Sequence, residues 1–450
     1  MTTITELKAA AQRILIAAAE KASRTTGFTK RKSKLTGALF VQTLVLGWLS
    51  RPEATLEELS QTAATLGVRI SPQGLDQRFT KEAAAFLHAV LKEAVYEKVR
   101  GEPVAVALLT RFHAVYLVDS SQVTLPRVLA DVWRGNGRSD PKAGTEASVK
   151  IHLALELVEG TLVGPELTDG KEQDRNANLM ATVLPKDTLR IADLGYFRLS
   201  ELARQSRLGV DWLTRFQTKT GFYDTDGRAW ELDAFLLAHD TDRSETEGPW
   251  TLDVPILLGL SERLPCRLLA VRVPPAVAEE RRRKLRQKAK ARGGTPSEKE
   301  LVLCDWSVLL TSVPVETLSL SEVFVLARLR WQIELVFKLW KSYLRIDEWR
   351  SKNPWRILCE VYAKLLAALL QHWTLVVTGW EIPDRSLFKA AATVRSFARS
   401  IALALCGKAS WDAVIGSIRR CLQAGCRLNK RRKAPSSAQL SFDPLLLGLN

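Results

Sequence analysis

The chain has 450 residues, of which 46% are hydrophobic and 25% charged, a balance typical of a folded globular protein rather than a disordered one. Its net charge of +16 predicts a polyanionic partner and, with the length, favours nucleic acid over an anionic membrane surface. Six cysteines without a C-x-x-C pair argue against a zinc site and give no disulfide framework, which fits a reducing cytoplasm.

No membrane-spanning segment is predicted. The longest apolar stretches, 39–49 and 365–377, are shorter than the roughly 18 residues that a span needs. The first apolar patch runs directly into Glu20 and Lys21, which is unlike a signal peptide.

Residues 1–105 are predicted to be helical, because apolar residues recur at helical spacing. Two short helices over 55–63 and 71–79, separated by a turn that contains Gly67, are typical of a helix-turn-helix. The alternative is a plain helical hairpin in a bundle. A basic cluster just before an apolar helix over 35–49 favours DNA contact; it comprises Lys30, Arg31, Lys32 and Lys34.

Short apolar strands replace this pattern from about residue 106. Two of the predicted strands end on a carboxylate, Asp119 and Asp193. A mixture of strands with a helix indicates an α/β domain. The expected strands are 115–119, 149–157, 161–167, 189–193 and 210–216, and the expected helix is 174–184.

Residues 221–304 are rich in short apolar runs and turn residues. This stretch contains a strongly basic run over 281–292. That run is either a solvated helix or disordered loop, or an arm that contacts DNA phosphates.

A strand over 306–311 and a long helix over 321–343 are expected next. On this helix a second stripe beside the apolar one comprises Arg330, Glu334, Lys338 and Lys341. A carboxylate flanked by cations suits phosphodiester chemistry, since the carboxylate binds a metal ion while the cations bind phosphates. The alternative is surface ion pairing between residues four apart. The chain after 355 is predicted to be helical, with a basic tail at 430–433.

The two strand-end aspartates raise the question of a metal site. A carboxylate at the end of a buried strand is costly unless it is paired or binds a cation. Two on adjacent strands repel each other unless a divalent ion lies between them, and Mg²⁺ prefers carboxylate and phosphate oxygens. One such aspartate is commonly a turn or cap residue, but Asp119 and Asp193 together with Glu334 favour a metal site.

The motif around Glu334 resembles the C-terminal signature of the insertion sequence 4 family of bacterial transposases. That signature reads Tyr, two residues, Arg, three residues, Glu, six residues, Lys. Arg330, Glu334 and Lys341 match at this spacing and follow the strand from Trp306. Ala327 stands at the Tyr position, a departure that concerns one contact with the DNA end.

The segments Asp193–Phe197 and Val118–Ser121 are similar to those around the family's two aspartates. The resemblance implies a DDE transposase with an α/β, RNase H-like catalytic core. The implied organisation is a helical DNA-binding domain over 1–105, the core over 106–220 and 305–354, a β-rich insertion over 221–304, and a helical C-terminal region over 355–450 that supplies dimer contacts.

The resemblance also implies what the enzyme binds. Asp119, Asp193 and Glu334 would hold two Mg²⁺ or Mn²⁺ ions, and Arg330, Lys338 and Lys341 would contact DNA phosphates. Trp306 would stack on a flipped base; the alternative is a core strand residue. The implied partners are terminal inverted repeats, target DNA and a second copy of the chain, at the nucleoid in the bacterial cytoplasm.

The implied reaction is cut-and-paste transposition, in some family members through a DNA hairpin. No membrane and no nucleotide cofactor are expected, and the sequence has no G-x-x-x-x-G-K-[ST] loop. Other classes fit part of the pattern: a structure-selective nuclease would lack the Arg330–Glu334–Lys341 spacing, and a helix-turn-helix regulator would need no strand-end aspartates. A decayed copy is a further alternative, against which the intact triad argues.

Overall fold

The computed structural model describes residues 3–31, 33–137, 146–180, 184–218, 220–240, 250–429 and 435–449. The chain forms two compact units, each assembled from separate stretches of sequence. The first unit comprises residues 1–105, 117–182 and 331–430, and the second comprises 106–116, 183–330 and 431–450. Lys32 and the basic tail at 430–433, both singled out from the sequence, lie outside the described residues.

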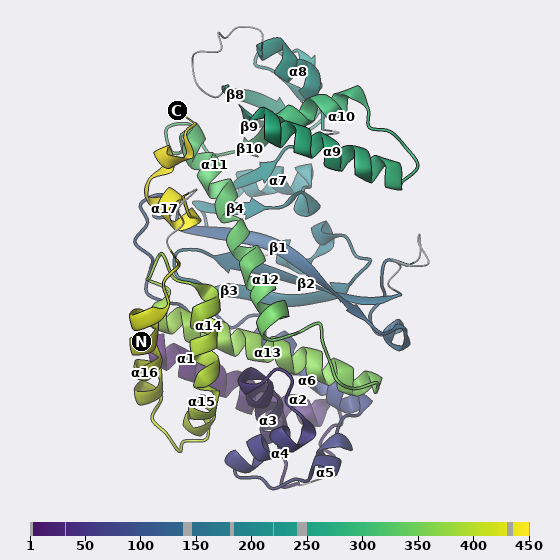
Figure 1. Cartoon of the computed structure of the whole chain (residues 1–450), viewed down its shortest axis with the longest axis vertical. Coiled ribbons are helices and arrows are strands. Elements are labelled where there is room, and N and C mark those ends of the chain that lie inside the picture. Colours follow the sequence, from purple (N-terminus) through teal and green to yellow (C-terminus); the bar gives the residue numbers. More distant parts are fainter. Residues whose placement is uncertain are drawn as a thin grey trace. The chain divides into compact units, whose positions relative to one another are not determined.

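The first unit is built around α13 (Pro354–Gly379), a helix of 26 residues that is buried from Ile357 to its end. Asn353 caps the helix by accepting the backbone N–H of Trp355 at 2.9 Å, and Pro354 occupies the first turn, where a missing N–H costs nothing. Figure 1 shows α13 among the helices it contacts, which include α3 (Gly37–Ser50), α6 (Lys81–Ala94) and α16 (Trp411–Gly425).

By length and composition α13 would be able to cross a membrane. The apolar stretch 365–377, judged too short from the sequence, is only part of this helix. Its apolar window is completely buried inside the protein. A helix that is apolar on all sides and covered by other helices is a core helix. The remaining helical segments of the first unit are α1 (Thr3–Gln12), the π-helical η1 (Arg13–Ala18), α2 (Ala19–Thr25), α4 (Leu56–Thr65), α5 (Pro72–Asp76), α12 (Trp331–Tyr343), α14 (Leu387–Ser396) and α15 (Ala398–Leu405).

The predicted second helix of the helix-turn-helix is shorter than expected. Ser71 caps α5 and Pro72 begins it, as predicted, but the helix ends at Asp76 instead of continuing to Phe79. A turn then leads to Thr80, which caps α6. Because α4 and α5 pack against each other, both the helix-turn-helix and the helical hairpin remain compatible with this region.

Strands in the order β3-β2-β1 complete the first unit. They are β1 (Ala114–Leu125), which begins in the second unit, β2 (Ala147–Glu156) and β3 (Leu162–Asp169); the short turn η2 (Arg127–Leu129) follows β1. β2 and β3 pair antiparallel. The expectation that Asp119 ends its strand is wrong, because the strand-forming residues after it extend β1 to Leu125.

The predicted helix over 174–184 is wrong in its described part. Residues 174–180 form two 3₁₀ turns, η3 (Asp174–Asn176) and η4 (Asn178–Met180). The carboxylate of Glu166 on β3 accepts the backbone N–H groups of Asn178 and Leu179 at 2.8 and 2.7 Å. These bonds fix the segment to the strand and replace the hydrogen bonds of a helix.

The second unit contains a sheet in the order β4-β5-β10-β9-β8-β6-β7. β4 and β5 run parallel, and β10 pairs antiparallel with β5 and β9. The strands are β4 (Thr188–Ala192), β5 (Asp211–Arg215), β6 (Phe222–Tyr223), β7 (Ala229–Trp230), β8 (Thr251–Leu258), β9 (Leu264–Arg272) and β10 (Trp306–Thr311). Four of them, β6 to β9, come from residues 221–304, where the resemblance implies a β-rich insertion.

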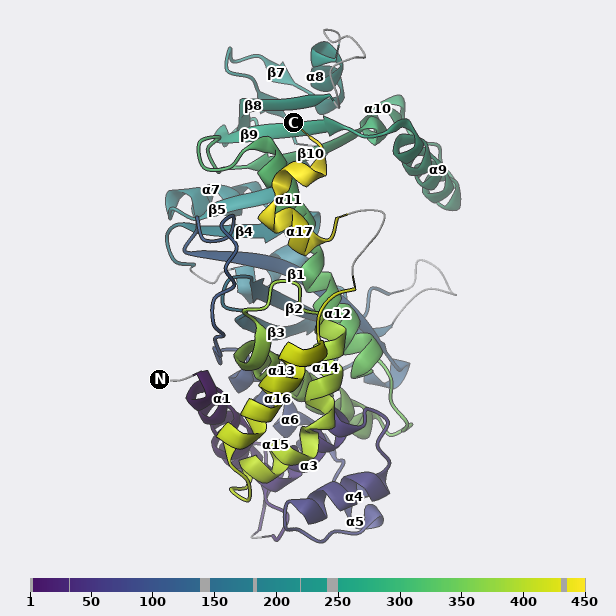
Figure 2. The ribbon, with the colours of Figure 1, turned by 60° about the vertical axis from the view of Figure 1, so that its left-hand side comes forward.

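Helical segments flank this sheet. They are η5 (Leu194–Tyr196), α7 (Leu199–Arg207), α8 (Leu232–His239), α9 (Pro275–Ala291), α10 (Glu298–Val302), η6 (Leu303–Asp305), α11 (Leu320–Leu329), α17 (Ser437–Phe442) and η7 (Pro444–Leu447). Figure 2 shows α9 projecting away from strands β8, β9 and β10 of its own unit. The basic run 281–292 therefore lies mainly in a helix, and a disordered loop is excluded.

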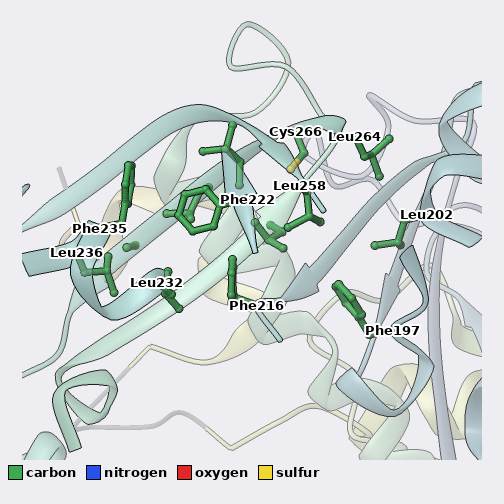
Figure 3. Close-up of a cluster of buried hydrophobic side chains, with 14 of the residues drawn as sticks. Phe197, Leu202, Phe216, Phe222, Leu232, Phe235, Leu236, Leu258, Leu264 and Cys266 are labelled. Atoms are coloured by element: carbon green, nitrogen blue, oxygen red, sulfur yellow. The ribbon is translucent and has the colours of Figure 1, made fainter. Parts of the chain in front are cut away.

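A cluster of buried aromatic and aliphatic side chains forms the core of the second unit. In Figure 3, Phe222 lies between Phe216 and Phe235. Its ring centroid is 5.8 Å from that of Phe216 and 5.1 Å from that of Phe235, both in the edge-to-face arrangement that aromatic pairs prefer.

The long helix predicted over 321–343 is in fact two helices. α11 ends at Leu329, α12 begins at Trp331, and Arg330 lies at the junction. The two helices belong to different units, and each packs within its own. The apolar repeat continues through the junction without a proline or glycine, so helical periodicity alone predicts a single helix.

Candidate active site

Asp193 lies at a strand end, as predicted. It directly follows β4 and precedes η5. Ile191 on β4 is opposite Leu213 on the parallel strand β5, so the carboxyl ends of both strands lie at the same edge of the sheet. Two residues further along each strand, Arg215 Nη2 donates to Asp193 Oδ1 at 2.7 Å.

Arg215 was not among the predicted site residues, although a signal was present. Both 189–193 and 210–216 were predicted as strands, the first ending on a carboxylate and the second carrying an arginine near its end. If the two strands are assumed to run parallel, their last residues become neighbours.

The charges around Asp193 keep its carboxylate ionised. Burial alone would raise the pKa of Asp193, but the hydrogen bond and charge of Arg215, together with the charge of Arg330, outweigh this effect and hold the pKa below its usual value. An ionised carboxylate is the form that binds a divalent cation. The same effect shows that Arg330, predicted to contact DNA, lies near Asp193 within the second unit.

Asp119 lies within β1 of the first unit, next to a partly buried charged pair. Its Oδ1 accepts the backbone N–H of Ser120 at 2.8 Å, and the hydroxyl of Ser120 donates to Asp174 Oδ1 at 3.0 Å. Lys150 Nζ on β2 lies 2.9 Å from the same Asp174 oxygen. The Lys150 and Asp174 side chains are only 14% and 23% exposed, so this network restrains the backbone at Asp119.

α12 carries three of the predicted residues in the first unit. Glu334 is half-buried in the first turn, where the helix dipole favours a carboxylate. Lys341 Nζ donates to the backbone carbonyl of Gln122 on β1 at 2.8 Å, which joins this helix to the strand of Asp119. Lys338 is exposed.

Trp306, predicted to stack on a flipped base, is a buried residue. It is 4% exposed at the start of β10. Its ring centroid lies 4.5 Å from that of Trp250 in an edge-to-face contact, and the guanidinium of Arg272 lies 5.5 Å from the ring. The structure agrees with the alternative interpretation as a core strand residue, since the contact with Trp250 would have to open before a base could stack on Trp306.

The basic cluster of the N-terminal helices is accessible. Lys30, Arg31 and Lys34 are exposed between α2 and α3. Exposed cations near a helix pair are compatible with phosphate contact, and this role stays a prediction.

The predicted metal ligands are divided between the units. Asp119 and Glu334 belong to the first and Asp193 to the second. Neither unit by itself gathers, among its described residues, three carboxylate, imidazole or thiol groups that would hold a metal ion. All three predicted ligands are carboxylates, the type that Mg²⁺ prefers, and Asp193 is held ionised, so the donor chemistry fits a divalent ion.

The family model described as "Transposase DDE domain" matches residues 110–370, a range that contains Asp119, Asp193 and Glu334. The chain belongs to this family and is a DDE transposase, an enzyme with an RNase H-like catalytic domain that acts on DNA. Divalent metal use is a general property of the class.

The similar proteins are transposases of insertion sequences. The chain is 29% identical to the transposase for insertion sequence element IS231C of Bacillus thuringiensis subsp. berliner, over 79% of this chain and 76% of that relative. It is 24% identical to the transposase for IS1151 of Clostridium perfringens, over 80% and 78%. A putative transposase InsL for IS186A of Escherichia coli (strain K12) is 29% identical over 56% of this chain and 67% of its own length. The resemblance to an insertion-sequence DDE transposase and the α/β, RNase H-like fold are thereby confirmed.

Proposed function

We propose that this transposase binds the terminal inverted repeats of an insertion sequence and moves the element by a cut-and-paste route. The reaction is metal-dependent cleavage at the ends followed by strand transfer into target DNA. A DNA hairpin at the cleaved end is the variant of this route that the resemblance implies.

The observation that carries the proposal is the state of Asp193 within the matched transposase domain. A strand-end carboxylate held ionised by Arg215 and Arg330 combines a metal ligand with cations that suit a phosphate. A regulator that only binds DNA would not need a carboxylate prepared in this way.

We assign the metal to Asp119, Asp193 and Glu334, as two Mg²⁺ or Mn²⁺ ions. When bound, these ions would activate the attacking oxygen and stabilise the leaving 3′ oxygen. Arg330, Lys338 and Lys341 bind phosphates near the cleaved end and neutralise charge there. An ammonium group has three donors, and Gln122 engages one of those of Lys341, so the others are available for a phosphate oxygen.

The proposal includes a dimer of the transposase that holds two paired DNA ends, with residues 355–450 supplying the contacts between subunits. This dimer acts at the nucleoid in the bacterial cytoplasm. The N-terminal cations Lys30, Arg31, Lys32 and Lys34 hold the repeat away from the cleavage point. Light scattering of the protein with repeat DNA tests the stoichiometry: two subunits on two ends are expected, and a monomer on paired ends contradicts the dimer.

The experiment that tests the function is cleavage of DNA carrying the inverted repeats that flank this gene. Wild type, Glu334→Gln and the control Glu316→Gln, which alters an exposed carboxylate outside the triad, are compared with and without Mg²⁺. Cuts at the repeat ends are expected with wild type and the control, only with metal, and not with Glu334→Gln. Repeat binding should survive in all three proteins.

Two outcomes would overturn the proposal. Tight repeat binding without any cleavage by wild type would indicate a binding protein or an inactive copy. Cleavage that persists in Glu334→Gln would remove the glutamate from the active site.

A further inference from the structure

The contacts that anchor the basic helix α9 to other described residues lie in its first half. Arg281 Nη1 donates to the carbonyl of Trp306 at 2.8 Å, and Arg281 Nη2 donates to the hydroxyl of Ser307 at 2.9 Å. Arg282 forms two hydrogen bonds of 2.6 Å to the carboxylate of Asp305. Ala278 is the buried residue of the helix. The first half of α9 is therefore fixed to the start of β10.

The second half of α9 carries positive charge that forms no ion pair with the described residues of the protein. No acidic residue occurs between Arg281 and Ser297. Glu279 and Glu280 form ion pairs with cations of the first turns, which include Arg283, Lys284 and Arg286. Further along, Lys288, Lys290 and Arg292 are exposed and form no ion pair within the part of the chain that the structure describes.

Helix stability explains only part of this charge. Cations in the last turn stabilise a helix through its dipole, by a few tenths of a kcal/mol to about 1 kcal/mol each, and the effect fades beyond that turn. Gly293 already ends the helix, with its N–H bonded to the carbonyl of Lys290 and a φ of +74°. A run of like charges along a helix with little buried surface is otherwise unfavourable.

The anchored end of α9 lies beside the Arg215–Asp193 pair of the same unit. Leu309 on β10 is opposite Arg215 on β5, and Ser307, which Arg281 contacts, is two residues away on the same strand. Burial lowers the pKa of Arg281, and the charge of Arg215 lowers it further, which places the two guanidinium groups near each other. The anchored half of α9 therefore lies close to Arg215, the partner of the proposed metal ligand Asp193.

We propose that α9 is a phosphate-binding arm that holds the DNA duplex immediately beside the scissile phosphate, through Lys288, Lys290 and Arg292. The inference rests on the proposed function and adds to it the place where this DNA is held. From Lys288 to Arg292 the chain rises about 6 Å along the helix axis. At roughly 3.4 Å per base pair, the three cations cover about two base pairs.

The test compares full-length wild type with Lys288→Gln/Lys290→Gln/Arg292→Gln. Glutamine keeps helix propensity close to that of lysine and arginine, and the positions are exposed, so the fold should be retained; a thermal unfolding curve checks this. The matched control is Lys186→Gln/Arg207→Gln/Arg228→Gln, which removes the same charge from exposed positions of the second unit outside α9. The probe is a duplex carrying one inverted repeat and its flanking sequence.

If α9 binds DNA phosphates, two properties of the α9 variant should differ from wild type. The slope of log K against log salt concentration should fall by up to about 2.7, which corresponds to 0.9 for each lost phosphate contact. Hydroxyl-radical protection should disappear over about two base pairs next to the cleavage point, while protection of the repeat itself remains. The control should keep the wild-type slope and footprint.

An unchanged slope and footprint in the α9 variant would show that these cations face solvent and do not contact DNA, and the inference would be wrong. A normal footprint with loss of subunit association would assign the arm to a second protein copy and also overturn it. If wild type neither binds nor cleaves the repeat, the proposed function fails instead, so the two failures are distinguishable.

Discussion

Lys341 Nζ donates a hydrogen bond of 2.8 Å to the backbone carbonyl of Gln122. The bond joins α12, which carries Glu334, to β1, which carries Asp119, inside the first unit. The family's signature lysine therefore has a structural contact as well as a proposed contact with DNA, and the two can be separated by experiment.

Lys341→Ala should lower both stability and DNA binding. Loss of the bond to Gln122 should reduce the free energy of unfolding by about 1 kcal/mol, and loss of a phosphate contact should reduce the salt slope of end binding by about 0.9. The neighbouring, exposed Lys338 is the matched comparison: Lys338→Ala should change the slope alone. Urea unfolding and binding titrations at several salt concentrations measure both quantities. Equal stability of the two variants would show that the Gln122 bond contributes little.

Arg215→Ala should change the pH dependence of stability. The folded-state pKa of Asp193 is lowered, so Asp193 contributes stability that is present above its ordinary pKa of about 4 and is lost as pH falls through the lowered value. Without Arg215 that pKa rises, because burial continues to act. The stability gap between wild type and Arg215→Ala should therefore be largest above about pH 4 and close below it. Thermal unfolding from pH 7 to pH 3 measures the gap, with the exposed Arg207→Ala as control; a gap equal at both ends would contradict the assignment.

Lys364→Met should destabilise the first unit strongly. Lys364 and Glu360 form a 2.8 Å ion pair on α13 with side chains 1% and 4% exposed, and Lys364 also donates to the carbonyls of Arg345 and Glu348 at 3.0 and 2.8 Å. Removing one partner leaves a buried, unpaired charge, at a cost of about 3–5 kcal/mol. The double variant Lys364→Met/Glu360→Leu should lose less. Denaturant unfolding measures both, and a double variant as unstable as the single one would show that the carbonyl contacts matter more than the ion pair.

Trp306→Ala should destabilise the second unit by about 3–5 kcal/mol, the usual cost of removing a buried tryptophan. Trp306→Phe should lose much less, since an aromatic ring still contacts Trp250. Trp331 is 53% exposed, so Trp331→Ala should change stability by no more than about 0.5 kcal/mol. A stable Trp306→Ala protein that has lost only end binding would favour the base-stacking role over the core role.

The parts of the fold that follow from local patterns were predictable. The strand before Asp193 and the strand from Trp306 were predicted correctly, because each is a short continuous apolar run, the pattern typical of a buried strand. The 3₁₀ turns from Asp174 onward were missed because Glu166 on the preceding strand binds the backbone N–H groups of the second turn, a contact that helical periodicity does not record. The break at Arg330 was missed because the apolar repeat does not record which unit each half contacts.

The candidate site was predictable to a similar extent. The family signature predicts Glu334 by its spacing, and the similarity of the segment Asp193–Phe197 predicts Asp193. The structure adds Arg215, Lys150 and Asp174, which no motif contains. Their positions depend on strand neighbours, which periodicity does not specify. Residue type alone does not decide the role of Trp306, since a side chain suited to stacking on bases is equally suited to a core.

The burial of α13 has a consequence for synthesis of the protein. This helix is the element against which α1, α3 and α6 pack, yet it begins only at Pro354. A ribosome makes the chain from its N-terminus, so the first helices leave the exit tunnel long before their principal packing partner exists. We expect that the N-terminal region reaches its final form late in translation, and that a fragment ending before α13 exposes the apolar face of α3 to solvent.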